Sequence, residues 1–170
     1  MSITAIGRQG EVLALRMLKG YPFYVDIIFQ ADWLIYYKNA WIVVEVKHKE
    51  MFTAGRNIPF DGHGLPPYQV EARNAFYRDT GIPCLLLVID KGVGDPRYVY
   101  FQFLHKLEKG RWKDTSINPC RIYDIQSFEK AVYPFDPRTN PNPAEVLDRL
   151  VQEHFMNQYL DTLLPDDPPF

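Results

Sequence analysis

The segment from Trp41 to Lys47 is the sequence feature that most restricts how this chain can fold. Its β-branched and aromatic residues are typical of an extended strand. Side chains on a strand alternate between two faces, so the even-numbered residues of this segment point into a core, whereas Glu45 and Lys47 share the opposite face. A carboxylate and an ammonium group on one face of an otherwise apolar strand predict a metal site beside a reacting phosphate.

The Glu-x-Lys spacing is weak evidence when it stands alone. Charged residues make up about a quarter of an average chain, so an acidic residue followed two positions later by lysine occurs by chance about once in a protein of this size. The pattern gains weight from three polar residues on neighbouring predicted elements. Asp32 begins the preceding β-rich run, Glu11 lies on the first predicted helix, and Gln69 lies on the helix that follows. These residues, with Glu45 and Lys47, form one candidate site.

Two positions in this site have competing interpretations. Glu11 falls at the border of the apolar stripe of its helix, where a solvated flank and a carboxylate that leans over the sheet edge fit the pattern equally well. Asp26, in the predicted strand over residues 21–30, competes with Asp32 as the metal-binding aspartate. Asp32 is preferred because a tight hairpin after residues 32–38 would bring the start of that strand beside the end of the next.

The length and composition indicate a folded protein that does not cross a membrane. A chain of 170 residues suffices for one domain with a substantial core, and an apolar content of 46% argues against disorder. No apolar run of about 18 residues exists to span a bilayer, and the first residues lack a signal-peptide pattern. The two cysteines, Cys84 and Cys120, are too few for a disulfide scaffold and lack metal-ligand spacing. We therefore expect a cytoplasmic protein.

The net charge of −2 conceals an asymmetry along the chain. Of the 19 basic and 21 acidic side chains, two basic and seven acidic ones lie in residues 134–170. The remaining 17 basic and 14 acidic side chains give residues 1–133 a net charge of +3. A mildly basic body permits nucleic-acid binding without requiring it.

Periodicity and turn residues predict an α/β protein with an αβββαβ core. The predicted elements are a helix over residues 3–19, strands over 21–30, 32–38, 41–47, 84–90 and 97–103, a helix that begins at Pro67, a short edge strand over 120–125 and a short helix over 127–132. Residues 84–90 form a continuous apolar run, which indicates a buried strand. Residues 48–66 are polar and rich in glycine and proline, and they predict a long loop of the kind that is usually functional or mobile.

The C-terminal region is predicted to form a separate unit over residues 134–170. A linker rich in proline and asparagine over residues 134–142 leads to an amphipathic helix that starts at Pro143 and stops before Pro165. The helix must bury its apolar stripe on the body or on a partner, and its acidic surface argues against binding to a membrane surface. Residues 1–133 then form the first domain.

The order of the site residues resembles the PD-(D/E)xK nuclease superfamily, the restriction-endonuclease-like proteins. The matching residues are Glu11 on the first helix, Asp32, Glu45-Val46-Lys47, and Gln69 on the second helix. Within the superfamily the chain is most similar to archaeal-type Holliday junction resolvases, over roughly residues 5–103. One departure is Ala31, which stands where the family has a proline. The resemblance implies a restriction-endonuclease-like core in which helices flank a mixed central sheet.

The resemblance also implies a metal site. Asp32 and Glu45 would bind Mg²⁺ (or Mn²⁺), with the Val46 carbonyl as a further ligand, and Glu11 would complete the acidic cluster directly or through water. Such a site suits magnesium, which prefers oxygen ligands and usually takes only one or two protein carboxylates. A hard divalent cation can neutralise a phosphate, generate hydroxide and stabilise a leaving oxygen.

Other residues have implied or expected roles around this metal site. By the resemblance, Lys47 would act on the attacking water, and Gln69 would steady the site from the second helix. Plausible phosphate contacts are Arg56, Arg73 and Arg78. His63 lies in the predicted loop, where an exposed loop histidine is the simpler interpretation and a catalytic or nucleic-acid-binding histidine is the alternative.

Three hypotheses for function follow. The leading one is a Mg²⁺-dependent endonuclease that acts on DNA, with a four-way junction, a damaged or branched duplex or a restriction site as substrate, and the resemblance suggests a homodimer. The second is a catalytically silent protein of the same fold that binds nucleic acid or another protein through the helix over residues 143–164. The third is a plain globular protein with a surface Glu-x-Lys. The sequence does not distinguish between DNA and RNA as the substrate.

Overall fold

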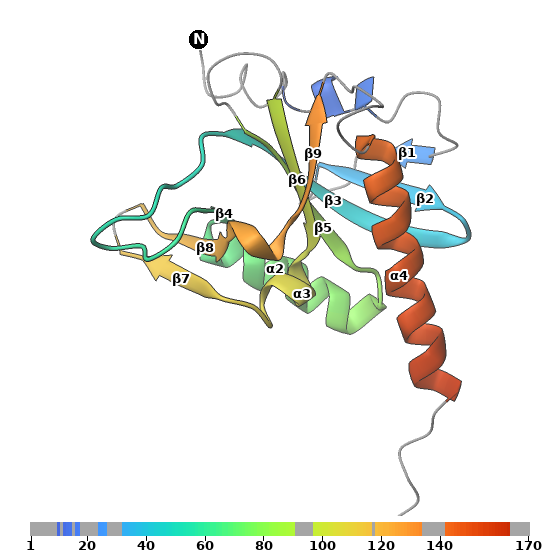
Figure 1. Ribbon diagram of the computed structural model, residues 1–170. Coiled ribbons are helices and arrows are strands. Elements are labelled where there is room, and N and C mark those ends of the chain that lie inside the picture. The colour runs from blue at the N-terminus through green and yellow to red at the C-terminus, as the bar shows by residue number, and fades with distance from the viewer. Residues whose placement is uncertain are drawn as a thin grey trace, which may run out of the picture.

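In the computed structural model of the protein, two β-sheets and the helices packed against them make up the described part of the molecule (Figure 1). The structure describes residues 10, 12–14, 16–17, 24–26, 32–90, 97–116, 118–133 and 142–163. For residues 24–26, 97 and 157–163 the description is of the backbone alone.

The larger sheet has six strands in the order β1-β2-β3-β5-β6-β9. Its strands are β1 (Tyr24–Asp26), β2 (Trp33–Tyr37), β3 (Ala40–Lys49), β5 (Cys84–Asp90), β6 (Arg97–Phe103) and β9 (Glu129–Tyr133). β3 and β5 run parallel, and the other neighbouring strands of this sheet run antiparallel. The predicted mixed central sheet is therefore confirmed.

A tight turn at Lys38 and Asn39 joins β2 to β3 and sets their register. Both residues have positive φ angles, 48° and 63°, which suit the two-residue turns that connect twisted antiparallel strands. Trp33 at the start of β2 pairs with Val44 of β3 as a result. The predicted hairpin is confirmed, and it brings the start of β2 beside the second half of β3.

Helices cover both faces of the larger sheet. They are α2 (Pro67–Thr80), α3 (Leu104–Leu107) and α4 (Pro143–Leu163), and the described residues between positions 10 and 17 are also helical. α2, α3 and the smaller sheet pack on one face, and α4 packs across the other (Figure 1). α2 begins at Pro67, as the sequence predicts, and it is capped by Gly81, whose φ is 72°. None of the described helices combines the length and the apolar character needed to span a bilayer.

The two faces of β3 pack into two separate cores. Ile42, Val44 and Val46 belong to the core under α4, together with Leu150 of that helix. Val43 belongs to the core on the side of α2. The predicted alternation of this strand is confirmed, and all seven residues of β5 are buried, as their continuous apolar run predicts.

The smaller sheet has three strands, β4 (Gly62–Leu65), β8 (Cys120–Asp124) and β7 (Trp112–Thr115), in the order β4-β8-β7. The sequence predicts a loop over residues 48–66, and this prediction is wrong at β4. A Cβ atom on Gly62 would lie 2.1 Å from the carbonyl oxygen of Tyr123, and one on Gly64 would lie 1.8 Å from that of Arg121. Only glycine allows β4 and β8 to approach so closely, so residues that look typical of a loop form a strand here.

The segment after β8 also differs from the prediction. The sequence predicts a short helix over residues 127–132, but the chain forms a 3₁₀ turn, η1 (Ile125–Ser127), and then β9. A pattern of six residues cannot distinguish a helix from a strand. Here the residues form a strand because they pair with the edge of β6. The short helix α3 and strand β7 lie in a region for which the sequence makes no prediction.

α4 attaches to the body by core packing and by two ion pairs at the surface. Lys38 donates to Asp148 at 2.8 Å, and Arg149 donates to Glu129 at 2.8 Å. Exposed ion pairs contribute about 0–1 kcal/mol each, so the buried apolar stripe provides most of the attachment. Of the two alternatives for this stripe, the structure shows packing on the body of the same chain.

We expect Leu150→Ala to lower the free energy of unfolding by about 2–5 kcal/mol, because a cavity then replaces a side chain that is buried between α4 and the sheet. Urea denaturation followed by far-UV circular dichroism measures the change. Glu153→Ala, on the exposed side of the same helix, is the matched control and should change stability by less than about 0.5 kcal/mol. Equal effects in the two variants would contradict the packing of α4 on the sheet.

Candidate functional site

A buried carboxylate, that of Glu45, lies at the centre of the candidate site. Glu45 is on the face of β3 that α2 covers, and it is only 3% exposed. Arg73 of α2 donates two hydrogen bonds to its Oε2 atom, from Nη2 at 2.7 Å and from Nε at 3.1 Å. Lys47 donates from Nζ to Oε1. Both carboxylate oxygens are therefore paired with cationic groups, which offsets the cost of burying the charge.

Asp32 lies beside Glu45, immediately before β2. The register runs from Trp33 opposite Val44, so the residue before Trp33 lies next to Glu45. The Oδ2 atom of Asp32 accepts a hydrogen bond of 2.6 Å from the backbone N–H of Val46. The structure thus brings Asp32 to the half of β3 that carries the Glu-Val-Lys pattern, as the hairpin argument predicts.

Gln69 lies one helical turn before Arg73 on α2. Residues four positions apart share one face of a helix, so Gln69 points to the same side as the arginine that reaches Glu45. Its Oε1 atom is buried and has no hydrogen-bond partner among the described residues. A buried acceptor of this kind is available to a water molecule or to a group of a substrate.

The other two carboxylates considered for the site are described only in part. Glu11 lies outside the described residues, so its place in the site stays a prediction. Gly10, the residue before it, is helical, and a Cβ atom there would lie 2.7 Å from the Cβ of His48 on β3. This helical segment therefore passes close to the second half of β3. Asp26, the competing aspartate, lies on the edge strand β1, opposite Leu34 of β2.

His63 lies in the interior of the protein, on β4. It is fully buried, and neither ring nitrogen has a hydrogen-bond partner in the described part of the chain. The centre of its ring lies 5.2 Å from that of Tyr100 and 6.4 Å from that of Phe128. Burial, reinforced by the charge of Lys49, lowers the pKa of His63 to about 3. The prediction of an exposed loop histidine is therefore wrong, and the ring is neutral near pH 7.

Lys49 is a neighbour of the site that sequence reasoning missed. It lies two residues after Lys47 on the same face of β3, and its Nζ donates to the carbonyl oxygen of Gly64 on β4. Its ammonium also lies 5.1 Å from the centre of the Phe52 ring. Burial lowers the pKa of Lys49. The signal in the sequence was the alternation of charged residues from Glu45 onward, which continues beyond the Glu-x-Lys pattern.

The three arginines expected to contact phosphate occupy different places. Arg73 is 8% exposed, and its guanidinium forms an ion pair with Glu45. Arg56 is exposed on the segment before β4, and Arg78 is exposed in the last turn of α2. The structure therefore brings Arg73 into the site and leaves Arg78 at the far end of the same helix.

The chemistry of the predicted metal ligands fits a hard divalent cation on one condition. Asp32, Glu45 and the Val46 carbonyl would supply oxygen ligands of the kind that magnesium prefers. Lys47 and Arg73 both pair with Glu45 and so stand in for a cation at that carboxylate. No group of three or more His, Cys, Asp or Glu side chains suited to a metal ion occurs among the described residues. A cation at Oε2 of Glu45 therefore requires Arg73 to move away.

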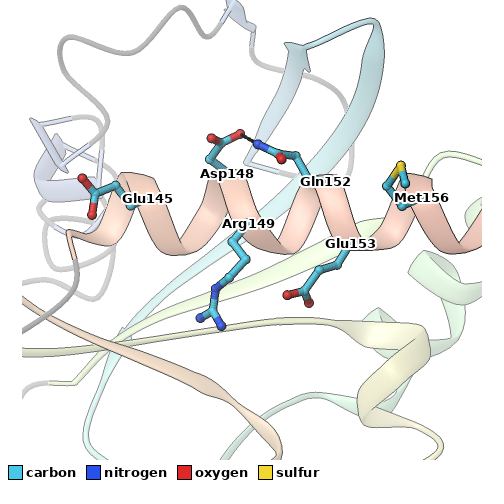
Figure 2. Close-up of a pocket in the computed structure, with 6 residues that line it drawn as sticks. All are labelled: Glu145, Asp148, Arg149, Gln152, Glu153 and Met156. Atoms are coloured by element: carbon cyan, nitrogen blue, oxygen red, sulfur yellow. Dashed lines mark hydrogen bonds between the residues drawn. The ribbon is translucent and has the colours of Figure 1, made fainter.

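A hollow of about 390 Å³ on the outer side of α4 is unsuited to phosphate chemistry (Figure 2). Its described lining residues come from this helix, and they are Glu145, Asp148, Arg149, Gln152, Glu153 and Met156. Three of the six are carboxylates, and Asp148 accepts a hydrogen bond of 2.9 Å from Gln152. This acidic surface repels a phosphate backbone.

The fold resembles that of a solved nuclease. The structure of Hjc, a Holliday junction resolvase from the archaeal hyperthermophile Archaeoglobus fulgidus, matches with a TM-score of 0.51 at 15% sequence identity, over 82% of this chain and 93% of that chain. The chain has a restriction-endonuclease-like fold. No protein-family model matches the sequence, and no curated protein matches it either. At this identity the likeness concerns the fold, and the predicted fold class is confirmed.

We expect Arg73→Gln to lower the free energy of unfolding by about 3 kcal/mol in metal-free buffer, because the buried carboxylate of Glu45 then keeps only one cationic partner. Urea denaturation in the presence of EDTA measures the loss. Arg78→Gln, which is exposed on the same helix, is the control. Adding Glu45→Gln to Arg73→Gln should recover part of the loss, since neither charge is then buried without a partner. A loss no larger than that of the control would contradict the role of Arg73 as counter-ion.

Proposed function

We propose that this protein is a Mg²⁺- or Mn²⁺-dependent endonuclease that hydrolyses phosphodiester bonds in DNA. The observation that carries the proposal is the position of Asp32, immediately before β2, beside Glu45 and Lys47 of β3, within a restriction-endonuclease-like fold. Branched or junction DNA is the proposed substrate class, supported by the likeness to a solved Holliday junction resolvase. The proposal includes a homodimer, and Glu11 as a further acidic residue of the site.

The proposed metal ligands are Asp32, Glu45, the Val46 carbonyl and Glu11. When bound, the cation would neutralise charge on the phosphate, lower the pKa of a water molecule and stabilise the leaving oxygen. The hydrogen bond from the Val46 N–H to Asp32 fixes the peptide unit that follows Glu45. The start of β2 and the middle of β3, which carry the two carboxylates, are thereby tied together before any substrate binds.

Lys47 lies between the buried carboxylate and the solvent. Its side chain is 25% exposed, whereas that of Glu45 is 3% exposed. A phosphate that approaches Glu45 from solvent therefore meets the Lys47 ammonium, which would stabilise developing negative charge or orient the attacking water. The buried Oε1 atom of Gln69 would accept a hydrogen bond from a water molecule in the same region.

Arg73 would change partners when the site is loaded. In the metal-free protein its guanidinium neutralises Glu45. Once positive charge is bound at Glu45, the guanidinium is repelled from the carboxylate, and its planar fork of donors is suited to a phosphate oxygen nearby. The observed ion pair and the expected phosphate contact of Arg73 are then two states of one residue.

We expect Arg73→Gln to bind Mn²⁺ about tenfold more tightly than the wild-type protein, because Oε2 of Glu45 no longer has to be released from the guanidinium. Isothermal titration calorimetry measures both affinities, and the rise in melting temperature with Mn²⁺ provides a second readout. Glu45→Gln is the control and should abolish binding. Weaker binding by Arg73→Gln would mean that Arg73 positions Glu45 for the metal and does not compete with it.

A catalytically silent module that binds nucleic acid or protein is the second candidate. The observation that favours it is the charge balance of the described site. Asp32 and Glu45 carry two negative charges, and Lys47 and Arg73 carry two positive charges, so the arrangement is neutral without a metal. Such a protein would bind DNA through the same surface and would leave it uncut.

Cleavage assays separate the two candidates. Supercoiled plasmid, linear duplex and a synthetic four-way junction are incubated with Mg²⁺, Mn²⁺ or EDTA. We expect metal-dependent cutting that falls at least about 100-fold in Asp32→Ala and in Lys47→Ala. Lys130→Ala, at an exposed lysine on β9, is the control and should cut at the wild-type rate. A folded protein that binds the junction but cuts none of these substrates would favour the silent module.

A further inference from the structure

A groove of about 580 Å³ opens beside the smaller sheet. It lies between the segment that precedes β4 and the turn that joins β7 to β8, and its described lining residues include Phe52, Arg56, Asn57, Lys113, Ser116 and Asn118. Its volume falls within the range of about 300–1,000 Å³ that is common for sites of organic ligands. Among the residues that the structure describes, none of those that line the groove belongs to the site around Glu45 or to the hollow on α4.

The groove carries an excess of positive charge. Arg56 and Lys113 contribute two exposed cationic groups. Asp114, the carboxylate among the described lining residues, accepts hydrogen bonds of 3.0 and 3.2 Å from Arg121. Arg121 also pairs with Glu108 at 3.0 Å. Arg56, Lys113 and Arg121 together outnumber the carboxylates of Asp114 and Glu108 by one positive charge. Phosphate groups are therefore attracted to this surface.

The floor of the groove is apolar and its walls are held in place. Phe52 and Ile58 pack against a small buried cluster that includes Phe60. On the opposite side, the hydroxyl of Thr115 accepts a hydrogen bond of 3.1 Å from the N–H of Cys120, which fixes the turn between β7 and β8. An aromatic floor edged by amide, hydroxyl and cationic donors fits an unstacked base and the phosphates beside it.

The groove continues the line of the site along β3. Lys47 and Lys49 follow Glu45 on one face of the strand, and the Phe52 ring lies under the Lys49 ammonium. Two backbone hydrogen bonds of 2.9 Å between Phe52 and Gly62 hold this end of the groove to β4. Phe52 follows Glu45 by seven residues, and an extended chain spans at most about 3.6 Å per residue, so the groove lies within roughly 25 Å of Glu45, the length of at most about seven stacked nucleotides.

We propose that this groove is an accessory DNA-binding site that holds an unpaired strand at most about seven nucleotides from the scissile phosphate. A base stacks on Phe52, and Arg56 and Lys113 bind neighbouring phosphates. The position of the scissile phosphate rests on the proposed nuclease function, but binding of the strand requires neither metal nor cleavage. DNA with a single-stranded arm that reaches the groove is then bound in preference to a fully paired duplex.

DNA binding in EDTA tests this proposal, because no metal-dependent cutting takes place. Fluorescence anisotropy measures the Kd of a labelled duplex that is blunt or ends in a single-stranded tail of about three or about nine nucleotides. We expect the longest tail to tighten binding about tenfold over the other two. The Arg56→Ala/Lys113→Ala protein should lose this gain, and the slope of its log Kd against log salt should fall by about 1.4, since about 0.7 counterions are released for each single-strand phosphate contact.

Two further variants make the test specific. Phe52→Leu should lose part of the tail-dependent gain with no change in salt slope, because it removes stacking and leaves the charges in place. Lys109→Ala/Lys130→Ala removes two exposed cationic groups elsewhere and is the matched control. Melting temperatures verify that each variant is folded.

The outcomes separate this proposal from the proposed nuclease function. The accessory site would be overturned if the wild-type protein bound all three DNAs with the same Kd. It would also be overturned if the Arg56→Ala/Lys113→Ala protein lost the same affinity for every tail, or no more affinity than the control variant. Tail-dependent binding without cutting in Mg²⁺ would uphold the groove and count against the nuclease. Cutting in Mg²⁺ without tail-dependent binding would uphold the nuclease and overturn the groove.

Discussion

The buried ion pair between Glu45 and Arg73 is the interaction on which the rest of the site depends. A carboxylate in the interior of a protein stays charged only where cationic groups compensate for the lost water. Because one partner is on β3 and the other on α2, the pair joins the sheet to the helix that covers it. The same contact sets the position of Gln69 one turn earlier on α2, and it leaves Lys47 as the cationic group nearer to solvent.

β3 does more than carry the site, because its last residues also support the smaller sheet. Lys49 donates to the carbonyl oxygen of Gly64, and the backbone of Phe52 pairs with that of Gly62. β4 can accept these contacts because its glycines lie flat against β8. One continuous segment, from Glu45 to Phe52, thus links the buried carboxylate to the groove beside the smaller sheet.

Local patterns predicted the strand geometry of the site because that geometry depends on neighbours in the sequence. The hairpin between β2 and β3 places Asp32 beside Glu45, and side-chain alternation places Glu45 and Lys47 on one face. The ion pair of Arg73 with Glu45 joins residues 28 positions apart, so a local pattern does not predict it. The one local indication is the spacing of four residues between Gln69 and Arg73, which places both on one face of α2. β4 was missed because its glycines are typical of a loop until β8 lies against them. The strand after η1 was missed because a short apolar run takes its conformation from the edge it pairs with.

The acidic outer surface of α4 gives the molecule an electrostatic polarity. Glu145, Asp148 and Glu153 lie on this surface, whereas the candidate site lies beyond the opposite face of the larger sheet. A polyanion that approaches from solvent exerts a torque that turns α4 away from it, so the molecule is oriented before contact and the rotational search is shortened. At about 0.15 M salt the Debye length is about 8 Å, less than the spacing of about 10 Å between packed layers. This orienting torque therefore acts over the last few ångströms of approach, and it weakens as the ionic strength rises.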